Sequence, residues 1–520
     1  RINQSSDNTK YYTGQLLAEY NIKFKNNEIN LLGGWSAEEN NYVSLNAMRT
    51  DIVGNELPAL GLGSTDGWSN GANETDWALL SGFMRLNYAY ANKYLFEANF
   101  RADASSRFSK KNRWGIFPSF SAGWRITEEK FMKNQDIFSN LKFRASWGQL
   151  GNQNGLGLYD YIPQYSISGY YPFASGLGQW AYVENLPSED RTWETVEMTN
   201  VAIEMGFLNN RLTFTGEYFI KRNKDMLVHI EMPSVIGINV PTGNYGELKV
   251  KGWDLSIGWN DNIGDLNYSA KFNLSDQKDE LVDYGVEYNG FTAGVNRRIQ
   301  GYSLGAIFGY KTDGYFQTQE EVDNSAVINR SVVGPGDIKY IDKDGDGKIS
   351  APNDLEYLGT TTPRFVFGLT LNATWREWDF GAIIQGVGKR NYYLNTEIMA
   401  PFSVTWGNFS YEMHNDYWTP ENPNASLPRH YAGSSHNYQI SDHWLQNAAY
   451  ARMKNLQLGY SFKKEWIRKA GLERLRLYFS GENLFEFSKL NKNFDPELTS
   501  TAGYIYPIMR NFSFGINVTL

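Results

Sequence analysis

Apolar and polar residues alternate with a period of two along much of this 520-residue chain. Near its end Phe512, Phe514, Ile516 and Val518 alternate with Ser513, Gly515, Asn517 and Thr519. Similar runs occur at 253–260 and 365–372. This period is typical of strands with one apolar and one polar face. Each run is about ten residues long, which is the length of a tilted strand that crosses a bilayer.

Fifteen such runs are recognisable, and the connections between them alternate between short and long. The runs are centred near residues 18, 32, 86, 98, 120, 145, 203, 216, 254, 270, 369, 384, 456, 480 and 513. Short connections carry KNNE, ANK, LNNR, DNIGD and REW, and the sequence predicts short amphipathic helices near 127–140 and 463–473. Long excursions rich in aromatic, Gly, Asn and Ser residues are expected at 38–80, 151–196, 223–248, 277–361, 390–448 and 488–506.

Tight turns at one end and long loops at the other are typical of an outer-membrane β-barrel. A large soluble all-β protein, such as a propeller, is the alternative, but no repeat of 40–50 residues is visible. No apolar run approaches the roughly 20 residues of a transmembrane helix, which excludes a helical membrane protein. Because fifteen is odd and only closed barrels satisfy every backbone group in lipid, we expect residues 1–520 to be the C-terminal part of a larger barrel.

Composition excludes several functions. The chain has no Cys, which rules out disulfides and thiolate chemistry. A net charge of −8 without a basic run gives no sign of nucleic-acid binding. No nucleophile or paired-carboxylate constellation stands out, so an enzyme is the least favoured class. Four of the five His residues lie in one excursion, but the spacing of His414, His430, His436 and His443 matches no zinc pattern.

The stretch YIDKDGDGKISAPNDLEYLG, residues 340–359, contains the D-x-D-x-D-G opening of a calcium loop. Its flanks predict turn and strand instead of the two helices of an EF-hand. The predicted ligands of Ca²⁺ are Asp342, Asp344, Asp346, the carbonyl of Lys348, Asn353 and Asp354. Asn353 occupies the twelfth position and Asp354 comes one residue late, so the loop departs from standard spacing. The expected role of the ion is structural, as a clip on a long loop; the alternative is an acidic turn without an ion.

Several stretches resemble the SusC-like (RagA/SusC) TonB-dependent outer-membrane transporters, over essentially the whole chain. They are RTWETVEMTNVAIEMGFLNNRLTFTGEYFIKRNKDMLV (191–228), GDIKYIDKDGDGKI (336–349), GTTTPRFVFGLTLNATWREWDFGAIIQGVG (359–388), WTPENPNASLPR (418–429), YARMKNLQLGYSFKKEWIRKAGLERLRLYFSGENLF (450–485) and YPIMRNFSFGINVTL (506–520).

The resemblance implies a 22-stranded barrel around an N-terminal plug, of which this chain would supply the last fifteen strands. It also implies active import of large nutrients across the outer membrane, energised by the TonB complex, with a SusD-like surface lipoprotein as a lid. Oligosaccharides are the expected cargo, and oligopeptides are the alternative within the family. A passive porin or a secreted β-rich binding protein would show similar strands.

Aromatic residues are concentrated in the excursions, where they pack loops, form an interfacial girdle, or contact substrate or lid. The candidates for contact with substrate or lid are Trp180, Tyr182, Trp406, Tyr411, Trp418 and Trp444. Charges on the polar strand faces are expected to face water inside the barrel: Glu97, Arg101, Asp103, Arg144, Glu204 and Glu217.

Overall fold

The computed structural model describes residues 1–52, 56, 59–174, 176–229, 235, 237–238, 241–285, 292–393, 402, 414–431, 436–468, 471–497, 506 and 508–520. The chain forms two compact units. Unit 1 comprises residues 1–133, 142–201 and 220–248, and unit 2 comprises residues 134–141, 202–219 and 249–520.

Antiparallel strands dominate the structure, and the fifteen predicted strands are all present. Their order in one sheet follows the sequence, with each strand beside the next strand of the sheet. They are β1 (Ile2–Phe24), β2 (Asn27–Arg49), β3 (Ser69–Tyr90), β4 (Tyr94–Ser105), β5 (Trp114–Arg125), β6 (Phe138–Asn152), β9 (Glu194–Phe207), β10 (Leu212–Val228), β11 (Gly243–Ile263), β12 (Leu266–Tyr284), β18 (Arg364–Trp375), β19 (Trp378–Lys389), β22 (Tyr450–Ser461), β23 (Arg474–Glu482) and β25 (Asn511–Thr519). A short strand, β24 (Glu486–Ser488), pairs with the first three residues of β22.

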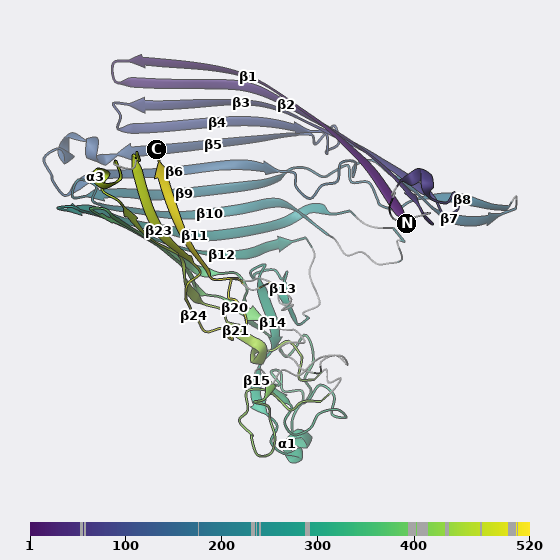
Figure 1. Ribbon diagram of the computed structural model, residues 1–520. Coiled ribbons are helices and arrows are strands. Elements are labelled where there is room, and N and C mark those ends of the chain that lie inside the picture. Colours follow the sequence, from purple (N-terminus) through teal and green to yellow (C-terminus); the bar gives the residue numbers. More distant parts are fainter. Residues whose placement is uncertain are drawn as a thin grey trace. The chain divides into compact units, whose positions relative to one another are not determined.

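The register in unit 1 shows why these sequences alternate. Cross-strand partners share a face of the sheet, and β1 to β5 lie side by side (Figure 1). One row across these strands is apolar: Leu16, Trp35, Gly82, Ala102 and Ile116. The neighbouring row, on the opposite face, is mostly polar: Gln15, Ser36, Ser81, Asp103 and Gly115. A slip of one residue would exchange these faces, so the pattern fixes the register.

Several strands are longer than the predicted ten residues. Strands β1 and β2 have 23 residues each and pair along their whole length. The excursion expected at 38–80 is therefore wrong in its bounds, because β2 continues to Arg49 and β3 begins at Ser69. Likewise β12 extends to Tyr284. The extensions contain runs such as EENN (38–41) and SNGANETD (69–76), which interrupt the apolar alternation while the backbone pairing continues.

The long excursions contain structure of their own. The 151–196 segment forms a hairpin, and 277–361 and 390–448 contribute short strands in unit 2. These elements are β7 (Tyr165–Phe173), β8 (Gly176–Val183), β13 (Gly294–Arg297), β14 (Ala306–Tyr310), β15 (Thr312–Tyr315), β16 (Ile338–Tyr340), β17 (Leu355–Thr360), β20 (Asn391–Tyr393), β21 (Leu445–Asn447) and helix α1 (Gln319–Asn324). Single 3₁₀ turns occur at η1 (Leu60–Leu62) and η5 (Asp442–Trp444).

The two predicted amphipathic helices are much shorter than expected. Residues 127–140 contain only the 3₁₀ turns η2 (Ile126–Glu128) and η3 (Lys130–Met132) among the described helices there. The 463–473 connection contains α3 (Lys464–Ile467), a single turn. Isolated helices this short are marginal in water, and neither connection buries a full apolar stripe.

Candidate functional site

In unit 2 the described parts of the excursions 277–361 and 390–448 fold into one body with a shared hydrophobic core, which we call the loop body. Ile440 accepts a backbone hydrogen bond of 2.8 Å from Tyr310, and Asp442 accepts one of 3.0 Å from Thr312. Figure 1 shows β13 to β15 and α1 within this part of the chain. The core residues come from both excursions: Ile307, Tyr310, Ile338, Tyr340, Ile349, Leu355, Tyr393, Leu427 and Trp444.

A buried carboxylate, Asp337, joins the two excursions at the centre of the loop body. It is 0% exposed, and Arg429 donates to both of its oxygens at 2.8 Å. The side-chain amide of Asn437 and the backbone N–H of Gly334 each donate at 2.9 Å. These bonds satisfy the buried charge, as burial of a carboxylate requires.

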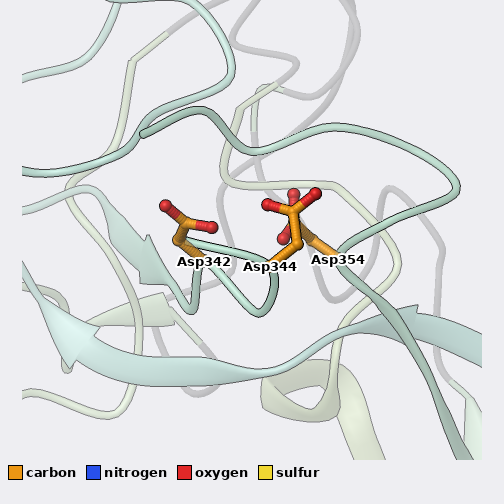
Figure 2. Close-up of side chains that lie close together, drawn as sticks. All are labelled: Asp342, Asp344 and Asp354. Carbon is orange, nitrogen blue, oxygen red and sulfur yellow. The ribbon is translucent and has the colours of Figure 1, made fainter. Parts of the chain in front are cut away.

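The acidic loop lies at the end of β16 and before β17, in the strand context that the sequence predicts. Carboxylate oxygens of Asp342, Asp344 and Asp354 lie within 4.8 Å of one another (Figure 2). The loop turns sharply because Gly345 and Gly347 adopt positive φ angles of 76° and 83°. Three carboxylates this close repel one another unless a cation lies among them.

Backbone N–H groups preorganise the acidic loop. Asp342 accepts hydrogen bonds from Gly345 at 2.7 Å and Gly347 at 2.9 Å. The bond from Gly347 is the main cause that lowers the pKa of Asp342 below its usual range, so this carboxylate stays ionised. Asp354 is only 1% exposed and accepts from Lys343 at 2.8 Å and Ser350 at 2.7 Å.

The other predicted calcium ligands lie near this trio without joining it. The Asn353 amide donates to Asp344 at 2.8 Å. The carboxylate of Asp346 accepts instead from the backbone N–H of Lys348 at 2.8 Å. Lys348 forms a bridge with Val327, and its neighbour Ile349 is buried in the core. The loop is thus anchored to the loop body on its exit side.

The candidate aromatic residues differ in exposure. Trp180 and Tyr182 on β8 in unit 1 stack with ring centroids 4.7 Å apart, and Trp180 is 41% exposed. Trp418 and Trp444 are buried in the loop body, where their indole N–H groups donate to Gln317 and Asn437. This burial argues against a contact role for these two and gives them a packing role. Trp406 and Tyr411 lie outside the described residues.

The histidines of the 390–448 excursion are packed into the loop body, away from the acidic trio. His414 and His436 are 1% and 3% exposed, and His436 bonds through Nε2 to the carbonyl of Ile338. Burial lowers the pKa of His443 to about 4, so this ring is neutral at pH 7. Within the described residues, only Asp342, Asp344 and Asp354 form a group of three or more His or carboxylate side chains close enough to hold one metal ion.

In unit 1, three of the predicted water-facing charges line a groove of about 860 Å³: Glu97, Arg101 and Asp103. Arg101 pairs with Asp103 at 2.8 Å and donates to Ser81 at 3.0 Å. Asn200 accepts from Arg144 at 3.5 Å. The other two predicted charges, Glu204 on β9 and Glu217 on β10, belong to unit 2.

The large antiparallel sheet, with one apolar and one polar face, is typical of an outer-membrane β-barrel. The sequence pattern of the family described as "TonB dependent receptor-like, beta-barrel" matches residues 2–484. The chain therefore belongs to the TonB-dependent receptor β-barrel family. Among the described residues, no helix is long and apolar enough to cross a membrane.

Curated relatives support this assignment. TonB-dependent receptor P26 of Formosa agariphila is 30% identical over 551 residues, which cover 98% of this chain and 53% of that protein. TonB-dependent receptor SusC of Bacteroides thetaiotaomicron is 29% identical over 468 residues, covering 85% of this chain and 43% of SusC. The chain thus spans about half the length of the curated relatives it matches.

Solved structures show the same fold. The RagAB peptide transporter superposes with a TM-score of 0.83 at 22% identity, over 99% of this chain and 56% of that chain. Its open-open state gives a TM-score of 0.81 at 21% identity.

Proposed function

We propose that this chain forms barrel strands and external loops of a transporter that imports large nutrients across the outer membrane, energised through TonB. The observation that carries the proposal is the family match over residues 2–484, combined with ordered excursions that share one core. Ordering long loops costs conformational entropy, about 1–2 kcal/mol per residue, so a folded loop body indicates a use at the barrel mouth.

Oligosaccharides are the proposed cargo, and a SusD-like surface lipoprotein is the proposed lid. The stacked pair Trp180 and Tyr182, in which Trp180 is exposed, supports this cargo, because aromatic faces pack well against the apolar faces of sugar rings. Oligopeptides are the second candidate, favoured by the fold shared with the RagAB peptide transporter.

Uptake by cells that carry the complete gene, compared with a deletion strain, tests the proposal. Fluorescently labelled oligosaccharides and oligopeptides of graded length serve as probes. We expect the complete gene to restore uptake of one class, and a second deletion of the TonB gene to abolish it. Uptake that persists without TonB would support a passive porin instead, and binding without uptake would support a surface receptor.

We also propose a structural Ca²⁺ ion among Asp342, Asp344 and Asp354. Hard oxygen ligands of this kind suit Ca²⁺, and the carbonyl of Lys348 and the amide oxygen of Asn353 are the proposed additional ligands. The ion would fix the acidic loop against Val327 and Ile349 and so stabilise the loop body. Asp346 is a further candidate ligand only if its carboxylate leaves the Lys348 N–H.

A further inference from the structure

The apolar face of β1 to β5 in unit 1 is hollowed by two adjoining grooves. One groove of about 550 Å³ lies between Leu16, Trp35, Met84 and Ile116. The other, of about 720 Å³, lies two residues further along the same strands, beside Leu80 and Trp114. Because the register places all of these side chains on one face, the two grooves form one path along the strands.

Small residues make the floor of this path. On the same face of its strand, each small residue lies two positions from a large one: Gly14 from Leu16, Gly33 from Trp35, and Ala102 from Phe100. A Cβ atom added at Gly14 or Gly33 would meet nothing within 4 Å, so the space above both positions is open. An exposed apolar hollow of this shape fits an acyl chain.

The aromatic residues on the same strands indicate where the grooves lie across the thickness of the membrane. Tyr90 and Tyr94 stack, with ring centroids 6.4 Å apart, beside the short turn between β3 and β4. Trp114 lies at the opposite end of the strands, at the start of β5. Ala104, the partner of Trp114, follows Tyr94 by ten residues, which in a strand tilted by about 40° spans about 25 Å. That is the height of the apolar band of an outer-membrane barrel, so Trp114 lies at the level of the outer headgroups.

Positive charge lies at this outer end. The segment from Ala104 to Trp114 carries four basic residues and no acidic one: Arg107, Lys110, Lys111 and Arg113. Arg113 lines the outer groove, and its buried Nε has no hydrogen-bond partner within the described residues. Lys110 is exposed, whereas Lys111 pairs with Asp190 at 2.6 Å.

The acidic groups of the outer groove lie at its opposite side, on β2. Glu38 accepts from the Tyr11 hydroxyl at 2.8 Å, and Glu39 accepts from the Asn41 amide at 3.2 Å. Two strands, β3 and β4, separate them from Arg113 on the β5 side. The groove therefore has a side that favours an anion and a side that does not.

We propose that this groove binds one outer-leaflet lipopolysaccharide molecule, with an acyl chain over Gly14 and Gly33 and a lipid A phosphate at Arg113 and Lys110. Guanidinium and ammonium groups at the headgroup level suit a phosphate, and the apolar path below them suits the chain. The proposal rests on the outer-membrane location of the barrel and is independent of the imported cargo.

Lipid analysis of the complete protein, purified from outer membranes in mild detergent, tests this site. Bound 3-hydroxy fatty acids and phosphate are measured per protein molecule by mass spectrometry. We expect the pair Lys110→Gln and Arg113→Gln to retain at least fivefold less lipopolysaccharide than the parent. Gly14→Leu with Gly33→Leu should cause a similar loss by filling the groove, and the open space at both positions lets this variant fold.

Lys489→Gln with Lys492→Gln, in a different loop, is the matched charge control and should retain the parental amount. Heat-dependent gel migration confirms that each variant has a folded barrel. Equal lipid in all variants would overturn the proposal, as would retention of phospholipid in place of lipopolysaccharide. Loss of lipid with uptake unchanged would support a lipid site that is separate from transport, whereas a parent protein that binds lipopolysaccharide but imports nothing would count only against the proposed transport function.

Discussion

Replacing Asp337 with Ala should loosen the whole loop body while the barrel strands stay folded. The substitution leaves Arg429, Asn437 and the Gly334 N–H without their common acceptor. Removing one partner of a buried ion pair costs about 3–5 kcal/mol, and we expect the lower end because the Arg429 side chain is 34% exposed. Hydrogen exchange at Ile338 and Tyr340 should therefore become roughly a hundredfold faster.

Asp313→Ala is the matched control in the same body. Asp313 pairs with Lys339 at 3.3 Å, but its side chain is 68% exposed, so the loss should be within about 1 kcal/mol. Exchange in β16 that is as slow in Asp337→Ala as in Asp313→Ala would contradict the central role given to the buried carboxylate.

Chelating calcium should expose the acidic loop to trypsin at Lys343 and Lys348. A ligand present at ten times its dissociation constant stabilises the bound form by about 1.4 kcal/mol, so its removal should speed cleavage about tenfold. Cleavage at Lys492, an exposed site in the segment after β24, serves as the internal reference. Asp342→Asn with Asp344→Asn and Asp354→Asn should be cleaved at the fast rate with or without chelator.

The variant Asp346→Asn separates the two ligand sets. If the ion is held by the three clustered carboxylates, this variant should keep most of its chelator response. A response lost as fully as in the triple variant would restore Asp346 to the ligand set that the sequence predicts. Absence of calcium from the parent protein by elemental analysis would refute the site altogether.

The strands were predictable because the two faces of each one meet different surroundings. All fifteen predicted strands are present in the sheet, since lipid demands an apolar row and the interior a polar one. The predicted excursion 38–80 ended β2 too early and began β3 too late, because polar runs in residues 38–49 and 69–78 interrupt the alternation although their backbones pair. The strands extend there through backbone hydrogen bonding, which does not require an alternating pattern of apolar and polar side chains.

The acidic loop was visible because its ligands are close in sequence, whereas the Asp337 centre was not. Asp337 and Arg429 are 92 residues apart, and nothing in their local sequence marks them as partners. The same separation explains Trp418 and Trp444: their burial depends on how two excursions fold together. Only the aromatic enrichment of the loops was available from sequence, and it does not distinguish a packed ring from an exposed one.

Oxygen and nickel accessibility of spin labels along β3 tests the membrane-barrel account most directly. The chain has no Cys, so single Cys residues can be placed without background in the complete protein, reconstituted in liposomes. Labels at Leu80, Met84 and Leu86 should be reached by lipid-soluble oxygen, and labels at Phe83 and Arg85 by water-soluble nickel chelate, in strict alternation. Equal access of the nickel chelate to all five positions would contradict a β3 strand that crosses the outer membrane.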